Sequence, residues 1–153
     1  MSDPAEHRRF ARHLAALGAV AEADEAELVT TVLGDEDTTM AVSAVIRHLD
    51  RRAAQLMSDP RFSAWAHAMA AATGEHDFLV RRLHEWTLLR RIAQAEPWTA
   101  EEVTGASDWL QRTAATNTRL AADPEVLGLL AVRGRTRRVR TAAGLRLRTP
   151  DLS

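Results

Sequence analysis

The six histidines of this chain are the side chains best suited to proton transfer or metal binding near neutral pH. No two of them stand four residues apart, and none belongs to a His-Glu-x-x-His motif, so the helical zinc pattern is missing. The chain also lacks Cys, which excludes disulfides and thiolate zinc ligands. The six are His7, His13, His48, His67, His76 and His84.

Two acidic clusters could offer further metal ligands. Residues 75–77 (Glu-His-Asp) are adjacent at an expected helix start, where such residues serve as cap and first-turn acids. Residues 35–37 (Asp-Glu-Asp) lack the oxygen spacing and central glycine of an EF-hand loop. We therefore predict no metal site.

Other catalytic signatures are missing as well. Ser43, Ser63 and Ser107 have no nucleophile-elbow context, and the chain contains neither a P-loop nor a dinucleotide-binding glycine pattern. We predict a protein that is not an enzyme and needs no cofactor. A competing hypothesis places a small-molecule or enzymatic site in an inter-helix pocket near His76, His84 and Trp86.

The basic residues are distributed unevenly. All 20 are Arg, and the complete lack of Lys indicates a GC-rich coding bias such as actinobacteria have. Residues 126–150 contain seven Arg and no acid, whereas the rest of the chain holds 13 Arg against 21 acids. This basic segment, centred on residues 133–148, is the strongest electrostatic feature of the sequence.

Three readings of the basic segment stay open: a solvated face, a surface for an acidic protein, and a contact to nucleic-acid phosphates. On a helix, Arg133, Arg137 and Arg140 would share one face by their spacing. No aromatic residues interleave the arginines, which disfavours single-stranded nucleic acid, and the net charge of −1 disfavours indiscriminate nucleic-acid binding. Trp98 is an additional candidate anchor, since Trp is enriched at interaction hot spots. The candidate partner-binding residues are Arg133, Arg135, Arg137, Arg138, Arg140 and Trp98.

The elements that must position these residues are predicted to be helices. Alanine dominates, Gly and Pro number 7 and 5, and β-branched and aromatic residues are too few for a sheet protein. Apolar spacing and capping residues place the helices as follows. They cover about 4–17, 24–34, 38–57, 60–74, 75–95, 99–110 with a possible break at Gly105 or at Ser107 and Asp108, 123–134 and 135–144. Residues 145–149 are left open between helix, strand and coil.

Residues 32–49 resemble a HEAT repeat, in which a helix ends in an acidic turn and a second helix follows. Asp35 and Asp37 stand at the turn, and Met40, Ala44 and Leu49 match the apolar and small positions. Residues 129–145 give a second match without the turn acid, and residues 77–89 a third and weaker one. The resemblance covers about half the chain and implies paired helices of the HEAT or armadillo kind, which usually bind proteins. It carries over no catalytic residue.

We therefore expect an all-α protein of one domain over residues 1–153. Its antiparallel helix pairs would stack as a short HEAT-like solenoid or form a compact irregular bundle. No signal-type or membrane-spanning apolar run is present, so we expect a cytoplasmic location and no membrane partner. The favoured function is a protein-interaction module for an acidic protein; nucleic-acid binding is the first alternative.

Overall fold

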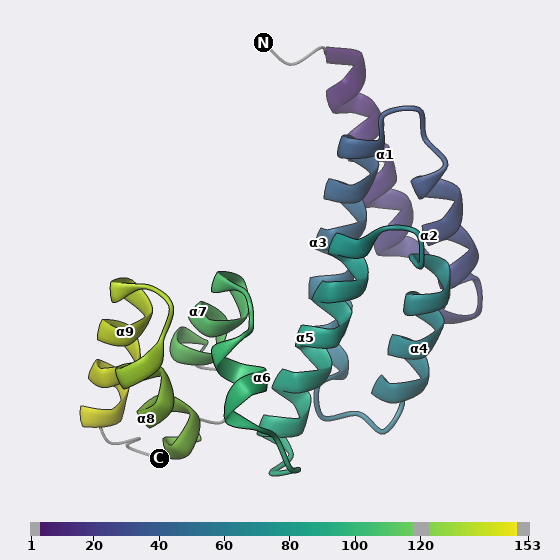
Figure 1. Ribbon diagram of the computed structural model, residues 1–153. Coiled ribbons are helices and arrows are strands. Elements are labelled where there is room, and N and C mark those ends of the chain that lie inside the picture. The colour runs from purple at the N-terminus through teal and green to yellow at the C-terminus, as the bar shows by residue number, and fades with distance from the viewer. Residues whose placement is uncertain (1–3, 118–122, 150–153) are drawn as a thin grey trace. The chain divides into compact units, whose positions relative to one another are not determined.

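The computed structural model describes residues 4–117 and 123–149, and within them the chain is helical, with no strand (Figure 1). The elements are α1 (Pro4–Ala19), η1 (Glu22–Asp24), α2 (Glu25–Leu33), α3 (Thr38–Leu56), α4 (Phe62–Ala72), α5 (Asp77–Ala93), α6 (Ala100–Thr104), α7 (Asp108–Thr116), α8 (Pro124–Arg133) and α9 (Arg137–Arg148). The all-α prediction is confirmed.

The contacts divide the chain into two compact units, residues 1–84 and 85–153. The single domain expected over residues 1–153 stays a prediction. Helix α5 contributes its first turns to the first unit and its last turns to the second. Each unit is a bundle of helices with its own core. The second unit carries all the arginines of the basic segment.

The first unit is built around α3, which packs against α1, α2 and α4. Its buried residues include Ala41, Ala44, Val45, Leu49 and Ala53, whereas Val42 and Ile46 are half-buried. Helix α4 completes the core with Phe62 and Trp65, whose rings lie 5.8 Å apart. Contacts with three other helices make α3 the central helix of this unit.

The second unit consists of an α8–α9 helical hairpin with α7 packed against both helices and α6 against α8. Leu110, Leu130 and Ala143 are fully buried between them. Trp86 of α5 is buried in this unit and lies edge-on to Trp109 of α7, with ring centroids 5.3 Å apart. Burial of such large rings contributes a large part of a small core.

Most predicted helix boundaries hold within two residues, and the exceptions have local causes. Gly105 does split the predicted helix at 99–110, because Ser107 caps a new helix by accepting a hydrogen bond from the Leu110 N–H. We predicted Pro60 as the first residue of the fourth helix, and this was wrong. The carboxylate of Asp59 instead accepts a hydrogen bond from the backbone N–H of Arg61, and α4 begins at Phe62.

Residues 32–49 and 129–145, the two stronger matches to a HEAT repeat, each span a turn between two helices. Helices α2 and α3 flank residues 34–37, and α8 and α9 flank residues 134–136. The third match lies within the single helix α5. No described helix combines the length and the apolar character needed to cross a membrane.

Candidate functional site

The basic segment forms the α8–α9 hairpin, and local sequence fixes both of its helices. Asp123 caps α8 by accepting a hydrogen bond from the Glu125 N–H, and Pro124 takes the first helical position. Thr136 caps α9 through its side chain, which accepts from the Val139 N–H at 3.1 Å. The alternating residues 145–148, left open in the sequence, are the last turn of α9.

Gly134 allows the close turn between the two helices. A Cβ at this position would lie 2.6 Å from the carbonyl oxygen of Leu130 and 2.8 Å from Cγ1 of Val139. Real side chains do not tolerate such contacts. The hairpin therefore depends on a glycine here for space.

Gln111 of α7 fastens this turn to the rest of the second unit. Its side chain is fully buried; Nε2 donates to the carbonyls of Val103 and Thr104, and Oε1 accepts from the backbone N–H of Arg135 at 2.8 Å. A buried amide with all these bonds made contributes rigidity as well as stability. The surface around the turn is consequently held in one position.

The N-terminus of α7 is fastened to α5 in a similar way. The buried carboxylate of Glu85 accepts hydrogen bonds from the Ser107 backbone N–H at 2.8 Å and from its hydroxyl at 2.6 Å. Because Ser107 also caps α7, one carboxylate fixes the position of that helix. Helix α7 in turn supports α9.

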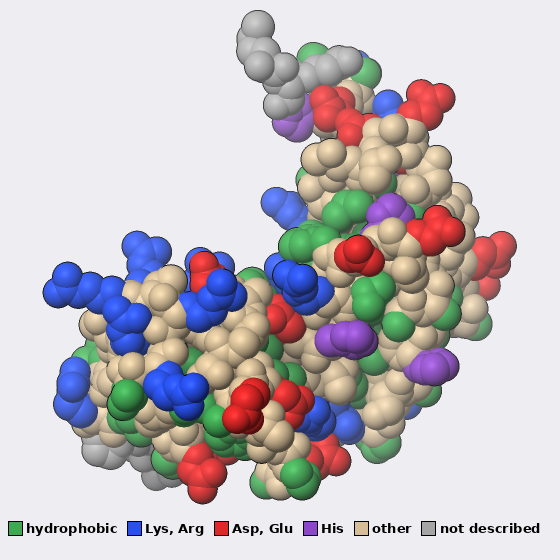
Figure 2. All heavy atoms as spheres, viewed as in Figure 1, with side chains coloured by type: hydrophobic (Ala, Val, Ile, Leu, Met, Phe, Trp, Pro, Cys, Tyr) green, Lys and Arg blue, Asp and Glu red, His purple; other side chains and the backbone are tan. Residues whose placement is uncertain are grey.

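Three of the predicted site arginines face solvent at one end of the hairpin. Arg133 ends α8, and Arg137 and Arg138 begin α9, directly across the turn at residues 134–136. All three are exposed, and none has a hydrogen bond or ion pair with another described residue. Figure 2 shows Arg side chains gathered over the region of α7 to α9.

Two others are used inside the unit. The guanidinium of Arg135 donates to the carbonyl of Ala106 at 3.0 Å, and that of Arg140 donates to the carbonyl of Gly134 at 2.8 Å. Both bonds satisfy main-chain oxygens at helix ends. These two arginines stabilise the hairpin, and their charge is only partly available to a ligand.

The prediction that three arginines share one face of a single helix was wrong. It placed Arg133, Arg137 and Arg140 on one helix, but Gly134 ends α8 before α9 begins. The hairpin turn brings Arg133 to the same end as Arg137. Arg140 points back toward the turn.

Trp98 lies apart from the arginine-bearing helices in sequence and element. It is half-buried in the segment between α5 and α6, whereas the arginines belong to α8, α9 and their turn. The structure shows no contact that joins it to the arginines among the described residues.

Three exposed aliphatic side chains beside the arginines were missed as site candidates. Val132 is 77% exposed, Leu145 58% and Leu147 42%. The spacing could have identified Leu145, which stands eight residues after Arg137 and therefore on the same face of α9. We did not assign Leu145 to a helix, because residues 145–148 alternate in a strand-like pattern.

The first unit holds a buried polar cluster that the sequence did not predict. Glu25 and His48 are both almost completely buried, and a Glu25 carboxylate oxygen lies 2.7 Å from Nε2 of His48. The same carboxylate accepts from Nε of Arg52 and from the indole N–H of Trp65, each at 3.0 Å. The available signal was Glu25 itself, which shares the face of α2 with Val29 and Val32.

The hydrogen bonds in this cluster fix its protonation pattern. Burial alone would raise the pKa of Glu25, but the bonds from His48, Arg52 and Trp65 outweigh it and lower that pKa to about 2. Arg51 lies 2.7 Å from Nδ1 of His48, and a guanidinium can only donate. The ring proton of His48 is therefore on Nε2, facing Glu25.

The cluster joins helices and does not present free groups to a ligand. Glu25, His48 and Trp65 connect α2, α3 and α4, and Arg51 reaches the Leu17 carbonyl of α1 at 3.4 Å. A polar pocket of about 190 Å³ opens beside it, but its buried charged groups already bond one another. We interpret the cluster as structural.

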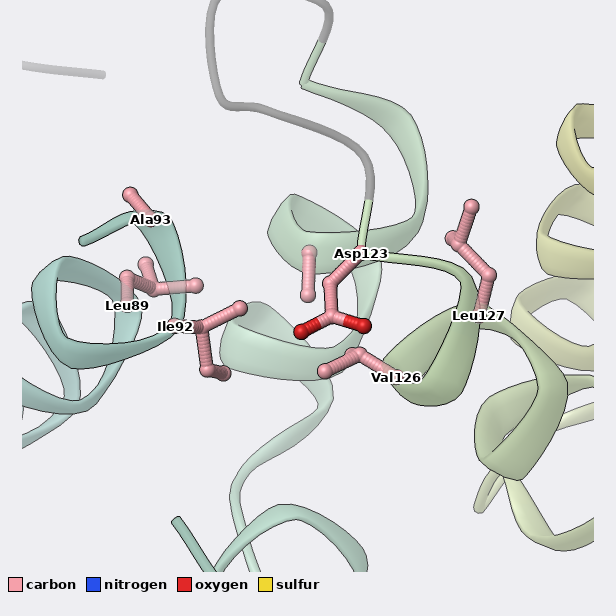
Figure 3. Close-up of a pocket in the computed structure, with 7 residues that line it drawn as sticks. Leu89, Ile92, Ala93, Asp123, Val126 and Leu127 are labelled. Atoms are coloured by element: carbon pink, nitrogen blue, oxygen red, sulfur yellow. The ribbon is translucent and has the colours of Figure 1, made fainter. Parts of the chain in front are cut away.

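The pocket hypothesis gains no converging side chains. His76 is half-buried before α5, His84 is exposed, and Trp86 is buried against Trp109. A separate cavity in the second unit measures about 10 Å³, enough for about one water molecule. Figure 3 shows the Asp123 carboxylate there among aliphatic side chains, including Ile92 and Val126. Within the described residues no group of three or more His, Asp or Glu is placed to hold a metal ion.

No family model, curated protein or solved structure matches this chain.

Proposed function

We propose that this chain is a non-enzymatic protein-interaction module of paired, HEAT-like helices that acts in a bacterial cytoplasm. Its second unit binds an acidic protein surface through the arginines at the turn end of the α8–α9 hairpin. The single observation that carries the proposal is the set of exposed guanidinium groups of Arg133, Arg137 and Arg138, which have no partner among residues 4–117 and 123–149.

The electrostatics of this end favour an anionic partner. The first turn of α9 contains no acidic residue, although the amino end of a helix favours negative charge. Arg137 and Arg138 add two positive charges at that end. Carboxylates from a partner would offset a repulsion that nothing in residues 126–150 can offset, because this stretch has no acid.

The rigidity of the surface also supports binding. Gln111, Gly134 and Arg140 hold the turn through buried or main-chain contacts, so the arginine end needs little ordering when a partner arrives. Less entropy is lost when a preorganised surface binds.

The test is affinity capture from a lysate of the organism that encodes the chain. The bait is the full chain, either unchanged or as the triple variant R133E/R137E/R138E. The control variant R12E/R81E reverses exposed arginines of the first unit. We expect the triple variant alone to lose its acidic partners. Recovery of the same partners by all three baits would remove the arginine surface from the proposal.

Nucleic-acid binding is separated by a second measurement. Fluorescence anisotropy with duplex and single-stranded oligonucleotides at about 50 mM salt detects phosphate contacts where they are strong. We expect no binding that depends on these arginines. Tight binding lost in the triple variant and in high salt would replace the protein partner with nucleic acid.

A further inference from the structure

We infer that the partner presents an acidic amphipathic helix, which lies along the outer face of α9 and packs one apolar residue on Leu145. This inference rests on the proposed function and names the class of partner. The outer face of α9 is defined by its exposed residues Arg137, Arg138, Thr141, Leu145 and Arg148.

The spacing of these residues makes a straight strip. Arg137, Thr141, Leu145 and Arg148 recur at intervals of four, four and three, which places them on one side of an α-helix. At 1.5 Å per residue the strip is roughly 16 Å long, about three helical turns. The opposite side, with Val139 and Ala143, is buried against α7 and α8.

The strip is charged at both ends and carries one exposed apolar side chain between them. Arg137 and Arg138 stand at its amino end, Arg148 at its carboxyl end, and Leu145 has 58% of its surface in water. Phosphates alone would match the arginines but leave the leucine exposed. A ligand with carboxylates around one apolar side chain matches both features.

A helix fits the strip better than an irregular loop. Its ridges can lie along those of α9, and side chains at intervals of three and four residues meet their counterparts. Arg138 and Leu145 are seven residues apart, and Leu145 and Arg148 are three apart. The partner would therefore carry an acid about two turns from its apolar residue on one side and about one turn on the other.

The inference is tested with synthetic helix-forming peptides of about 18 residues, a length at which an Ala-rich helix forms in water. The first peptide carries Glu at both positions matched to the arginines and Leu between them. The second has Ser in place of that Leu, and the third has Gln in place of each Glu. Binding to the full chain is measured by fluorescence anisotropy at low salt.

We expect the Leu peptide to bind about five to ten times tighter than the Ser peptide, because a leucine buried only on one side gains less than the more than tenfold of complete burial. Leu145→Ser should abolish this ratio while leaving binding of the Ser peptide unchanged. R138Q/R148Q should weaken both acidic peptides to the level of the Gln peptide. The control R12Q/R81Q should change neither.

The outcomes separate this inference from the proposed function. If the chain binds the Leu and Ser peptides equally through its arginines, the leucine contact is wrong but an acidic partner stands. If no peptide binds, the helical partner is wrong, and the capture experiment still decides the function. Binding of phosphatidylglycerol vesicles that is lost in Leu145→Ser would also overturn it, in favour of a lipid surface.

Discussion

The two units differ in the partners of their arginine side chains. In the first unit, arginines pair with carboxylates from other helices or loops: Arg9 with Asp35, Arg52 with Glu25, and Arg82 with Asp50. In the second unit, Arg91 pairs with Glu102, and Arg135 lies 3.7 Å from the carboxylate of Asp108. The arginines of the hairpin differ: Arg135, Arg140 and Arg146 donate to main-chain carbonyls, and Arg133, Arg137 and Arg138 face solvent.

Composition explains part of this difference. Residues 1–84 hold 9 Arg and 13 acids, whereas residues 85–153 hold 11 Arg and 8 acids. The acids of the second unit also lie mainly before residue 126, away from the hairpin sequence. The arginines of the hairpin therefore have few acids of their own unit to pair with.

The largest loss of stability is expected when the buried carboxylate of Glu25 is removed from the first unit. Glu25→Ala removes the carboxylate that bonds His48, Arg52 and Trp65, and should lower the free energy of unfolding of that unit by about 3 to 5 kcal/mol. Hydrogen exchange of α2 and α3 amides measures this. Glu27→Ala, an exposed acid on the same helix, is the control and should cost under about 0.5 kcal/mol. Equal effects would show that the buried cluster is not what holds the unit together.

Acid should weaken the same cluster. The pKa of Glu25 is about 2 in the folded chain against 4.5 for the free group. Its stabilisation is therefore fully present above pH 4.5 and is lost as the pH falls toward 2, up to about 3 kcal/mol. Asp35 and Asp59, each with a pKa near 2, titrate in the same range. The difference in stability between the unchanged chain and Glu25→Ala isolates Glu25. A difference that stays constant from pH 6 to about pH 2 would contradict the assignment.

Two glycines of α8 and its turn test the hairpin of the second unit. Gly134→Ala should destabilise it by about 2 kcal/mol, because the new Cβ would meet the Leu130 carbonyl and Val139. Gly128→Ala, where a Cβ meets nothing within 4 Å, should stabilise α8 by up to about 1 kcal/mol. Thermal unfolding followed by circular dichroism gives both signs. Two changes of the same sign would mean that the turn is not tightly packed.

The smallest change in stability is expected for single arginines of α9, and it distinguishes an arginine that bonds a carbonyl from one that faces solvent. Arg140→Ala removes a donor from the Gly134 carbonyl and should cost about 1 kcal/mol. Arg138→Ala should change stability by less than about 0.5 kcal/mol, since its side chain is exposed. Urea unfolding of the two variants measures the contrast. A large loss of stability in Arg138→Ala would argue that this residue is structural.

Helix content and most helix ends could be predicted from local residues. Asp37, Thr99 and Asp123 cap helices close to the predicted starts at residues 38, 99 and 123, and Gly34 and Gly134 follow helices at the predicted ends. Capping is decided within a few residues along the chain, so a local pattern contains it. The predicted helix start at Pro60 was wrong, because Asp59 forms a turn with Arg61 and does not cap a helix.

The candidate site was predictable only as a list of residues. The sequence shows that residues 126–150 are basic and contain no acid, and this feature alone identified the arginines as candidates. It does not show which guanidinium groups are free of protein contacts. That depends on the carbonyls of Ala106 and Gly134, which accept hydrogen bonds from Arg135 and Arg140.

The sequence by itself determined that the chain is helical and where its unbalanced positive charge lies, since both follow from residue type and short-range spacing. Only the tertiary structure decided that Glu25, His48 and Trp65 meet, that Gln111 fastens the turn at Arg135, and that Leu145 is left in water. Those facts depend on contacts between residues 20 to 40 positions apart, or on the lack of them, and no local pattern records which helix packs on which.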